Sequence, residues 1–386
     1  MYRMGKEEID AVAKVIYSKE LFKVNGGDLQ ETQNFEKELR EKLDIDHAVL
    51  MTSGFAALQA ALTGMGIGPG DEVIVPAYTY IATAMAVVAV GAMPVVAEVD
   101  DSLMIDPLDI EKKITSKTKA VIPVHMEGYP CDMDAIMAVA KKHNIKVLED
   151  ACQAVGGSYK GKRLSTIGHA GAFSFNFYKN ISAGEGGALM TNDKEIFENG
   201  LIFHDSCAIA YFGKQMKDFS AEPFCGSEFR TNEITAAIMR VQLTRLDGIL
   251  EDLRKNKKKL MELLAPYIGF VRSNDPEGEC SPKITLKFET KEAALAFQEK
   301  YPEALIPANV GKHVYNDWKV IIEKRGARNP LMNPFNFEAN KGFEFPVDAC
   351  EKSLEILAKH AHIAINPDWT EEEIKAKADE IIAALK

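Results

Sequence analysis

The stretch of sequence that decides the fold runs from residue 146 to residue 193 and reads KVLEDACQAVGGSYKGKRLSTIGHAGAFSFNFYKNISAGEGGALMTND. It contains three short apolar runs with the length of buried β-strands, KVLEDA (146–151), AGAFSFN (170–176) and GGALMTN (186–192). Two charged residues, Asp150 and Lys179, come at or soon after the ends of the first two runs. Residues that follow the strands of an open sheet are the first to inspect for function.

The region before this stretch alternates strand-like runs with helical ones. The strand-like runs are HAVLMTS (47–53), DEVIVPA (71–77), MPVVAEV (93–99) and KAVIPVH (119–125), and helical patterns separate them. Such alternation is typical of a mostly parallel sheet that is covered by helices on both faces. We therefore predict an α/β fold.

The region after it predicts a second unit. A helical pattern extends from Asn232 to about Leu264, and from about Val271 the pattern changes. SPKITLKFE (281–289) reads as a strand, KEAALAFQEKY (291–301) as a helix, and the tail as a capped helix that opens at Thr370. We predict a large domain of residues 1–255, which starts with a helical segment, and a smaller domain of residues 256–386.

The composition indicates a globular protein that acts on small molecules. Of the 386 residues, 46% are apolar, and 57 acidic against 46 basic residues give a net charge of −11. An acidic surface attracts neither phosphate backbones nor anionic lipids. We therefore expect neither a nucleic acid nor a membrane surface as a partner.

The cysteines and the N-terminus favour a cytoplasmic protein. The six cysteines form no CxxC pair and no cluster with histidines, so we interpret them as reduced thiols and expect no metal site. Residues 1–17, MYRMGKEEIDAVAKVIY, have acidic residues where a signal peptide needs its apolar core. Residues 73–97 contain no charged residue, but Pro76, Gly91 and Pro94 interrupt them, which favours a buried strand, helix and strand over a membrane span.

Several residues after the predicted strands are candidates for binding. Thr52-Ser53-Gly54 joins a strand to a helix, where free N–H groups and the helix dipole suit a phosphate, although such turns are common. Tyr78 and Tyr80 follow the next strand and, taken alone, are ordinary core aromatics. Neither a GxGxxG motif nor a Walker loop is present, so no motif supports nucleotide binding.

Asp150 and Lys179 are the candidates for chemistry. Asp150, with Glu149 beside it, ends an apolar strand, where a buried carboxylate is costly unless a positive group pairs with it. Lys179 follows a strongly apolar run and precedes a glycine-rich turn, a setting that can desolvate its ammonium group. A lysine so placed can form a Schiff base with a carbonyl compound.

Five segments together resemble the DegT/DnrJ/EryC1/StrS family of sugar aminotransferases. They are TSGFAAL (52–58), VIVPAYTYIATA (73–84), VLEDACQAVGGSYKGKRLSTIG (147–168), FSFNFYKNISAGEGGALMTND (173–193) and a late pattern of FP (345–346) followed by WTEEEI (369–374). The resemblance implies the cofactor pyridoxal 5′-phosphate and the aspartate aminotransferase-like fold of the type I transferases. That fold has a mostly parallel seven-stranded sheet in its large domain and a smaller C-terminal α+β domain.

The resemblance also implies roles for single residues. Lys179 would hold the cofactor aldehyde, and Asp150 would pair with the pyridine nitrogen and keep it protonated, so that the ring acts as an electron sink. Tyr80 would stack on the ring, and Gln153 would lie near the ring hydroxyl. The phosphate would be bound by Ser174 and by the turn Ser53-Gly54.

Two positions in the phosphate cup depart from the family pattern. Phe55 stands where the family usually has Thr, and the cup loses a hydroxyl group. Glu228, in Gly226-Ser-Glu-Phe-Arg230, stands where an Asn usually reaches the phosphate of a neighbouring subunit. A carboxylate there repels a phosphate unless Arg230 or a lysine intervenes. The same segment implies a homodimer with shared active sites.

Three classes of function stay open. The first is an aminotransferase that moves an amino group, in this family most often from glutamate, to a keto or aldehyde sugar. The second is a sugar dehydratase with the same cofactor, but that branch has His where this chain has Lys179. The third is a non-catalytic binding or regulatory relative, in view of Phe55 and Glu228.

The acceptor sugar also stays open between two types. VHMEG (124–128), DPEGE (275–279) and YNDWK (315–319) resemble the subgroup that aminates the terminal carbon of an eight-carbon sugar acid. A nucleotide-linked sugar is the alternative.

Overall fold

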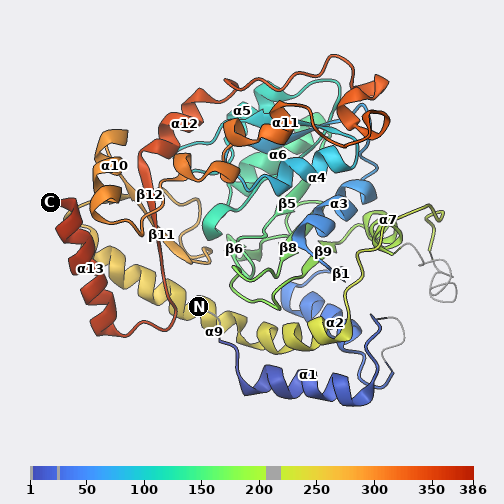
Figure 1. The fold of residues 1–386 in the computed structure, drawn as a ribbon, viewed down its shortest axis with the longest axis horizontal. Helices are drawn as coiled ribbons and strands as arrows, with labels where there is room; N and C mark the ends of the chain where they lie inside the picture. The colour runs from blue at the N-terminus through green and yellow to red at the C-terminus, as the bar shows by residue number, and fades with distance from the viewer. Residues whose placement is uncertain (1–2, 24–26, 206–218) are drawn as a thin grey trace.

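The computed structural model describes residues 3–23, 27–205 and 219–386, and its centre is a seven-stranded sheet (Figure 1). The strands are β1 (His47–Met51), β2 (Glu72–Pro76), β3 (Met93–Ala97), β4 (Thr118–Val121), β5 (Lys146–Asp150), β8 (Ala170–Ser174) and β9 (Gly187–Thr191). Their order is β1-β9-β8-β5-β4-β2-β3. Only β9 runs antiparallel to its neighbours. The predicted mostly parallel sheet is confirmed.

Helices follow the strands of this sheet. They are α3 (Gly54–Gly64), α4 (Ala82–Ala89), α5 (Pro107–Lys113), α6 (Met133–His143) and α7 (Lys194–His204). The helix α3 is almost wholly buried because it packs against the sheet and against α7. Glycines make this approach possible, since a Cβ on Gly64 would lie 2.6 Å from the carbonyl oxygen of Ile196. Strands β8 and β9 are buried along their whole length, as expected of strands covered on both faces.

Three further helices surround the N-terminal part of the sheet. They are α1 (Lys6–Ser18), α2 (Glu31–Leu43) and the long α9 (Glu233–Leu264), which contacts both of the others (Figure 1). The side chain of Asn232 caps α9 by accepting the N–H of Thr235 at 3.1 Å. The side chain of Glu233 accepts the N–H groups of Glu31 and Thr32 at the start of α2. The N-terminal end of α9 therefore holds the start of α2 in place.

A three-stranded antiparallel sheet lies in the C-terminal part of the chain, in the order β10-β11-β12. Its strands are β10 (Gly269–Phe270), β11 (Lys283–Lys287) and β12 (His360–Ala364), and its helices are α10 (Lys291–Lys300), α11 (Lys319–Ile322), α12 (Glu351–Ala358) and α13 (Glu371–Leu385). The predicted strand, helix and capped terminal helix are confirmed. The domain boundary between residues 255 and 256 stays a prediction, and α9 passes through it unbroken.

Short elements complete the fold. A two-stranded hairpin pairs β6 (Ser158–Tyr159) with β7 (Lys162–Arg163). The 3₁₀ helices are Met126–Gly128, Pro307–Asn309, Gly311–His313, Tyr315–Asp317, Pro330–Met332, Pro334–Asn336 and Glu338–Asn340. Most of these lie between α10 and α12, where the chain runs back over the large sheet.

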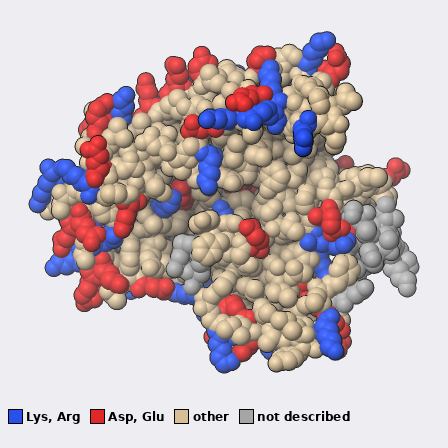
Figure 2. All heavy atoms as spheres, viewed as in Figure 1, with Lys and Arg blue, Asp and Glu red and all other residues tan. Residues whose placement is uncertain are grey.

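The surface carries charges of both signs, and the described cysteines form no disulfide. Figure 2 shows acidic and basic side chains intermixed at the rim of one face, whose centre is mostly uncharged. Among the described residues the free cysteines are Cys131, Cys152, Cys225, Cys280 and Cys350, and Cys207 lies outside those residues. Of the helices in the described ranges, none combines the length and the apolar character that a membrane crossing requires.

Candidate active site

Four segments of the chain meet at one edge of the large sheet. Strands β1, β5 and β8 end there, and the antiparallel β9 begins there. A Cβ on Gly54 would lie 2.6 Å from Sγ of Cys152 and 2.9 Å from Cβ of Ser174. A Cβ on Gly187 would lie 2.4 Å from the backbone nitrogen of Gly54. The predicted phosphate turn is therefore enclosed so tightly that only glycine fits at these two positions.

The turn at Ser53 is a helix N-terminus that suits an anion. The Ser53 hydroxyl caps α3 by accepting the N–H of Ala56 at 3.1 Å. The first N–H groups of a helix have no acceptor within the helix, and the helix dipole adds positive potential at this end. Phe55 packs its ring against the hydrophobic core. The cup thus keeps its main-chain donors although it lacks a hydroxyl group at position 55.

Asp150 is a buried carboxylate, only 4% exposed, at the end of β5. One of its oxygens accepts the hydroxyl of Thr83 at 2.8 Å, and the other accepts the N–H of Cys152 at 3.1 Å. Among the described residues, no Lys, Arg or His lies within 4.0 Å of its oxygens. A buried carboxylate is costly without a positive partner, so this position fits a ligand that carries a positive charge.

Glu149 is also buried but is fully satisfied by the protein. Its two oxygens accept backbone N–H groups of Ser165, Ile167 and Gly168 at 2.6–2.9 Å. The ring of His125 accepts the N–H of Cys131 at Nδ1, so its Nε2 carries the proton that points to Glu149 at 3.3 Å. Glu149 therefore has a structural role, and Asp150 is the carboxylate that is available to a ligand.

Lys179 lies in the connection between β8 and β9. Its backbone N–H donates to the carbonyl of Asn176 at 3.0 Å, and its side chain is half-buried. Burial and then the charge of Asp150 raise the pKa of the Cys152 thiol well above its usual value, while the charge of Lys179 opposes them. Lys179 thus lies close enough to the end of β5 to act on its groups electrostatically.

Tyr80 and Gln153 lie on the segments that follow β2 and β5. The ring of Tyr80 is 42% exposed. It meets the ring of His313 edge to face at 5.6 Å, and Nζ of Lys312 lies 5.3 Å from its centre. The side-chain oxygen of Gln153 accepts the backbone N–H of Glu127 at 3.1 Å. We did not predict His313, Lys312 or Glu127 as site residues, although the segments VHMEG and YNDWK lie at or near them.

Glu228 lies near the phosphate turn of its own chain. The N–H of Thr52 donates to the carbonyl of Phe229 at 3.0 Å, so the segment runs beside the end of β1. Oε1 of Glu228 lies 3.0 Å from Nε of Arg230, and Arg230 also pairs with Asp205. The expected neutralising partner of Glu228 is therefore present, and the Glu228 side chain is 48% exposed.

The structure thus brings most of the predicted residues to one edge of the sheet. The residues at or next to the enclosed turn are Ser53, Gly54, Phe55, Asp150, Ser174 and, one connection further, Lys179. Tyr80, Gln153 and Glu228 lie around them, on the segments after β2 and β5 and beside β1.

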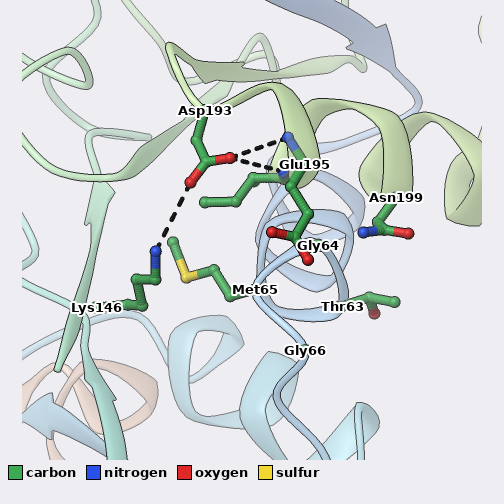
Figure 3. Close-up of a pocket in the computed structure, with 9 residues that line it drawn as sticks. Thr63, Gly64, Met65, Gly66, Lys146, Asp193, Glu195 and Asn199 are labelled. Atoms are coloured by element: carbon green, nitrogen blue, oxygen red, sulfur yellow. Dashed lines mark hydrogen bonds and ion pairs between the residues drawn. The ribbon is translucent and has the colours of Figure 1, made fainter. Parts of the chain in front are cut away.

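A hollow of about 240 Å³ lies at the opposite edge of the sheet (Figure 3). It faces Lys146, the first residue of β5, whereas Asp150 is the last. Asp193 lies 3.7 Å from Lys146 and accepts the N–H groups of Glu195 and Ile196, which caps α7. Its polar groups already serve the fold, so we do not assign the hollow to the site. Among the described residues, no group of three or more His, Cys, Asp or Glu is arranged to hold a metal.

Comparisons with known proteins agree with this geometry. The model of the DegT/DnrJ/EryC1/StrS aminotransferase family matches residues 3–324. The dTDP-3-amino-3,4,6-trideoxy-α-D-glucose transaminase of Streptomyces venezuelae is 44% identical over 220 residues, which are 56% of each chain. A putative L-glutamine:3-amino-2,3-dideoxy-scyllo-inosose aminotransferase of Micromonospora echinospora is 30% identical over 352 residues, 84% of this chain and 81% of that one.

Solved structures are similar over nearly the whole chain. An aminotransferase from Psychrobacter cryohalolentis superposes with a TM-score of 0.80 at 27% identity, over 99% of this chain and 98% of that one. This likeness confirms the predicted fold class. The curated match to the Streptomyces enzyme, in contrast, spans little more than half of that enzyme's length.

Proposed function

Because the chain belongs to the DegT/DnrJ/EryC1/StrS aminotransferase family, we propose that it is a sugar aminotransferase that uses pyridoxal 5′-phosphate. The observation that carries the proposal is Asp150, a buried carboxylate without a cationic partner among the described residues, at the same sheet edge as Lys179 and the enclosed turn at Gly54. A protonated pyridine nitrogen supplies the missing positive charge.

The residues present fit this cofactor. The helix N-terminus at Ser53-Gly54, with Ser174 beside it, would hold the phosphate. Lys179 would hold the aldehyde, Tyr80 would cover one face of the ring, and Gln153 would lie near the ring hydroxyl. When bound, the cofactor receives the amino group of the donor, passes it to the acceptor, and withdraws electrons from the reacting carbon.

Three side chains would then carry the reaction. Asp150 keeps a proton on the ring nitrogen, and the Thr83 hydroxyl and the Cys152 N–H hold its two oxygens in place. The amine of Lys179, once the donor has displaced it, would act as the general base and acid that takes a proton from the substrate carbon and gives it back during the transfer. The face of Tyr80 fixes the plane of the ring, so that Lys179 stays aligned with the atoms between which it moves the proton.

We also propose a homodimer with shared active sites. The segment Gly226–Arg230 matches the family element that reaches the partner's cofactor, and it lies beside the phosphate turn. Phe177 and Tyr178, next to Lys179, are 58% and 77% exposed, which is unusual for aromatic side chains beside a functional lysine. An isologous interface over this edge would cover both.

Glutamate is the proposed amino donor, and the acceptor is a keto or aldehyde sugar. Relatives of the chain are named for dTDP-linked and GDP-linked amino sugars. The segments VHMEG, DPEGE and YNDWK favour an eight-carbon sugar acid that is aminated at its terminal carbon. Lys179 argues against the dehydratase alternative, and the presence of Lys179, Asp150 and the enclosed turn argues against a non-catalytic relative.

Absorbance spectroscopy and borohydride labelling test the proposal. The purified protein mixed with pyridoxal 5′-phosphate should show a visible band that glutamate removes, and reduction should place the label on the peptide that contains Lys179. A panel of keto and aldehyde sugars, including sugar acids and nucleotide-linked sugars, should then restore the band with one acceptor class. A protein that shows no band, or a band that does not respond to glutamate, refutes the proposed function.

A further inference from the structure

A segment from the C-terminal part of the chain pairs with the loop that carries Tyr80. We call residues 311–315 the strap. The strap runs antiparallel to residues 77–81 through three backbone hydrogen bonds of 2.9–3.0 Å, from Thr79 N–H to His313 O, from Ile81 N–H to Lys312 O and from Tyr315 N–H to Ala77 O. This pairing fixes two side chains of the strap, those of Lys312 and His313, against the ring of Tyr80.

The ring of His313 has no hydrogen-bond partner among the described residues. Its ring nitrogens make no hydrogen bond with any residue in the described ranges. Burial is the main cause that lowers the pKa of His313 to about 4; Glu127 opposes this shift, and nearby lysines, Lys179 among them, add to it. The imidazole is therefore neutral at pH 7, with one nitrogen free to donate and the other free to accept.

Lys312 is a cation that has no ion-pair partner in the part of the chain that the structure describes. Its Nζ lies 5.3 Å from the centre of the Tyr80 ring, and its side chain is exposed. No carboxylate of a described residue lies within 4.0 Å of it. The phosphate turn follows β1 whereas Tyr80 follows β2, and four strands, β5 with Asp150 among them, lie between these two in the sheet.

Two buried groups close to the strap, Glu127 and His362, are in contrast paired. Glu127, a buried residue with a left-handed φ of 52°, lies 2.8 Å from Nζ of Lys283. The ring of His362 bonds to the hydroxyl of Tyr78 at 2.9 Å and to that of Thr285 at 2.8 Å. These groups are thus satisfied within the chain, whereas the described residues provide no hydrogen-bond partner for the His313 ring and no counter-charge for Lys312.

We propose that His313 and Lys312 form the acceptor-binding subsite, in which His313 hydrogen-bonds to a hydroxyl of the acceptor and Lys312 pairs with an anionic group that the acceptor carries. This inference rests on the proposed function and narrows its substrate class to hydroxylated sugars that bear a negative charge. The charge is either the carboxylate of a sugar acid or the diphosphate of a nucleotide-linked sugar. Both are anions that a lysine binds.

The two half-reactions, each followed by the absorbance of the bound cofactor, test this assignment in the intact protein. The donor step uses glutamate. The acceptor step uses three probes: a sugar acid with a terminal aldehyde, the same aldehyde sugar with its carboxylate replaced by a hydroxymethyl group, and a nucleoside-diphosphate 4-keto hexose. Variants are Lys312→Met, Lys312→Arg and His313→Phe, with Lys319→Met as the matched control, because Lys319 is another exposed lysine without an ion pair among the described residues.

For Lys312→Met we expect a rise of about tenfold or more in the half-saturating concentration of one charged acceptor, the size of a lost charge-assisted hydrogen bond. Lys312→Arg should restore most of the lost affinity. The uncharged analogue should have the same half-saturating concentration with the unmodified protein, Lys312→Met and Lys312→Arg. The charged probe that shows the loss identifies the source of the charge. His313→Phe should weaken every acceptor while the spectrum and the glutamate step stay as they were.

Three results overturn the assignment. One is Lys312→Met behaving like Lys319→Met toward both charged acceptors. Another is an equal loss in the glutamate step and the acceptor step, because Lys312 would then bind the donor. The third is a changed cofactor spectrum in His313→Phe, since His313 would then position Tyr80 and not bind the acceptor. An unmodified protein that does not react with glutamate refutes the proposed function itself, and this inference falls with it.

Discussion

Replacing Asp150 by Asn should separate activity from stability. The carboxylate is 4% exposed, so its charge is hardly screened by water. If the proposed cofactor is bound, a pyridinium at ~3 Å would interact with this carboxylate by ~5 kcal/mol at an effective dielectric constant of ~20. Loss of one partner of a buried pair typically costs about 3–5 kcal/mol, which corresponds to a fall in turnover of about 10²- to 10⁴-fold.

The same change should not weaken the cofactor-free fold. The side-chain oxygen of Asn can still accept the N–H of Cys152, and its NH₂ group can donate to the hydroxyl of Thr83. The substitution also removes a buried charge that has no Lys, Arg or His within 4.0 Å among the described residues. The free energy of unfolding of the cofactor-free variant should therefore equal or exceed that of the unmodified protein.

Glu149→Gln is the matched control, because it changes the neighbouring buried carboxylate in the same way. Its NH₂ group would face N–H donors that now bond to Glu149, and we expect a loss of about 1–3 kcal/mol in unfolding free energy. Single-turnover absorbance with glutamate measures activity, and urea titration without cofactor measures stability. Near-normal turnover of Asp150→Asn, or a large loss of its stability, refutes the reasoning.

Three further predictions follow from the described groups. Lys179→Ala should abolish turnover and move no borohydride label to another lysine, as peptide mapping shows; a label elsewhere contradicts the assignment. Glu228→Asn should tighten cofactor binding by a few-fold in spectral titrations if the carboxylate faces the phosphate, because it leaves Arg230 with one acidic partner less; looser binding would mean that Glu228 supports the cup. Burial lowers the pKa of His313 to about 4 and that of His362 to about 3, so between pH ~6.5 and ~4 the unfolded chain binds protons that the folded chain does not. The free energy of unfolding, measured by urea titration at each pH, should thus fall as the pH is lowered through this window. A His362→Gln variant whose free energy of unfolding depends on pH as steeply as that of the unmodified protein would contradict the account.

The predicted elements and the main site residues share one physical cause. Periodic apolar runs mark the buried strands, and residues at the ends of parallel strands meet at one edge of the sheet. The local pattern alone therefore predicts that Asp150, Ser53 and Ser174 lie close together. Arg230 was predicted as the partner of Glu228 because they are two residues apart, and the ion pair is present.

The residues that the sequence did not reveal depend on contacts between distant segments. The strap pairs residues 311–315 with residues 77–81, and nothing in either segment alone indicates the other. The choice between Glu149 and Asp150 also needed the structure, since the two are adjacent in an apolar strand. The three N–H groups of the segment after β7 and the ring of His125 show that Glu149 is already occupied.

The enclosed turn at Gly54 has a consequence for which mutations the protein tolerates. The main chain of Gly187 and the side chains of Cys152 and Ser174 crowd this turn, and the proposed phosphate donors are main-chain N–H groups, which a substitution does not remove. Substitutions should therefore be tolerated at position 55, where this chain has phenylalanine and the family usually has threonine. They should not be tolerated at Gly54 and Gly187, where a single methyl group has no space. In a saturation mutagenesis library, we expect tolerated and inactivating substitutions at adjacent positions of this loop. The size of the new side chain, and not its polarity, should separate the two outcomes.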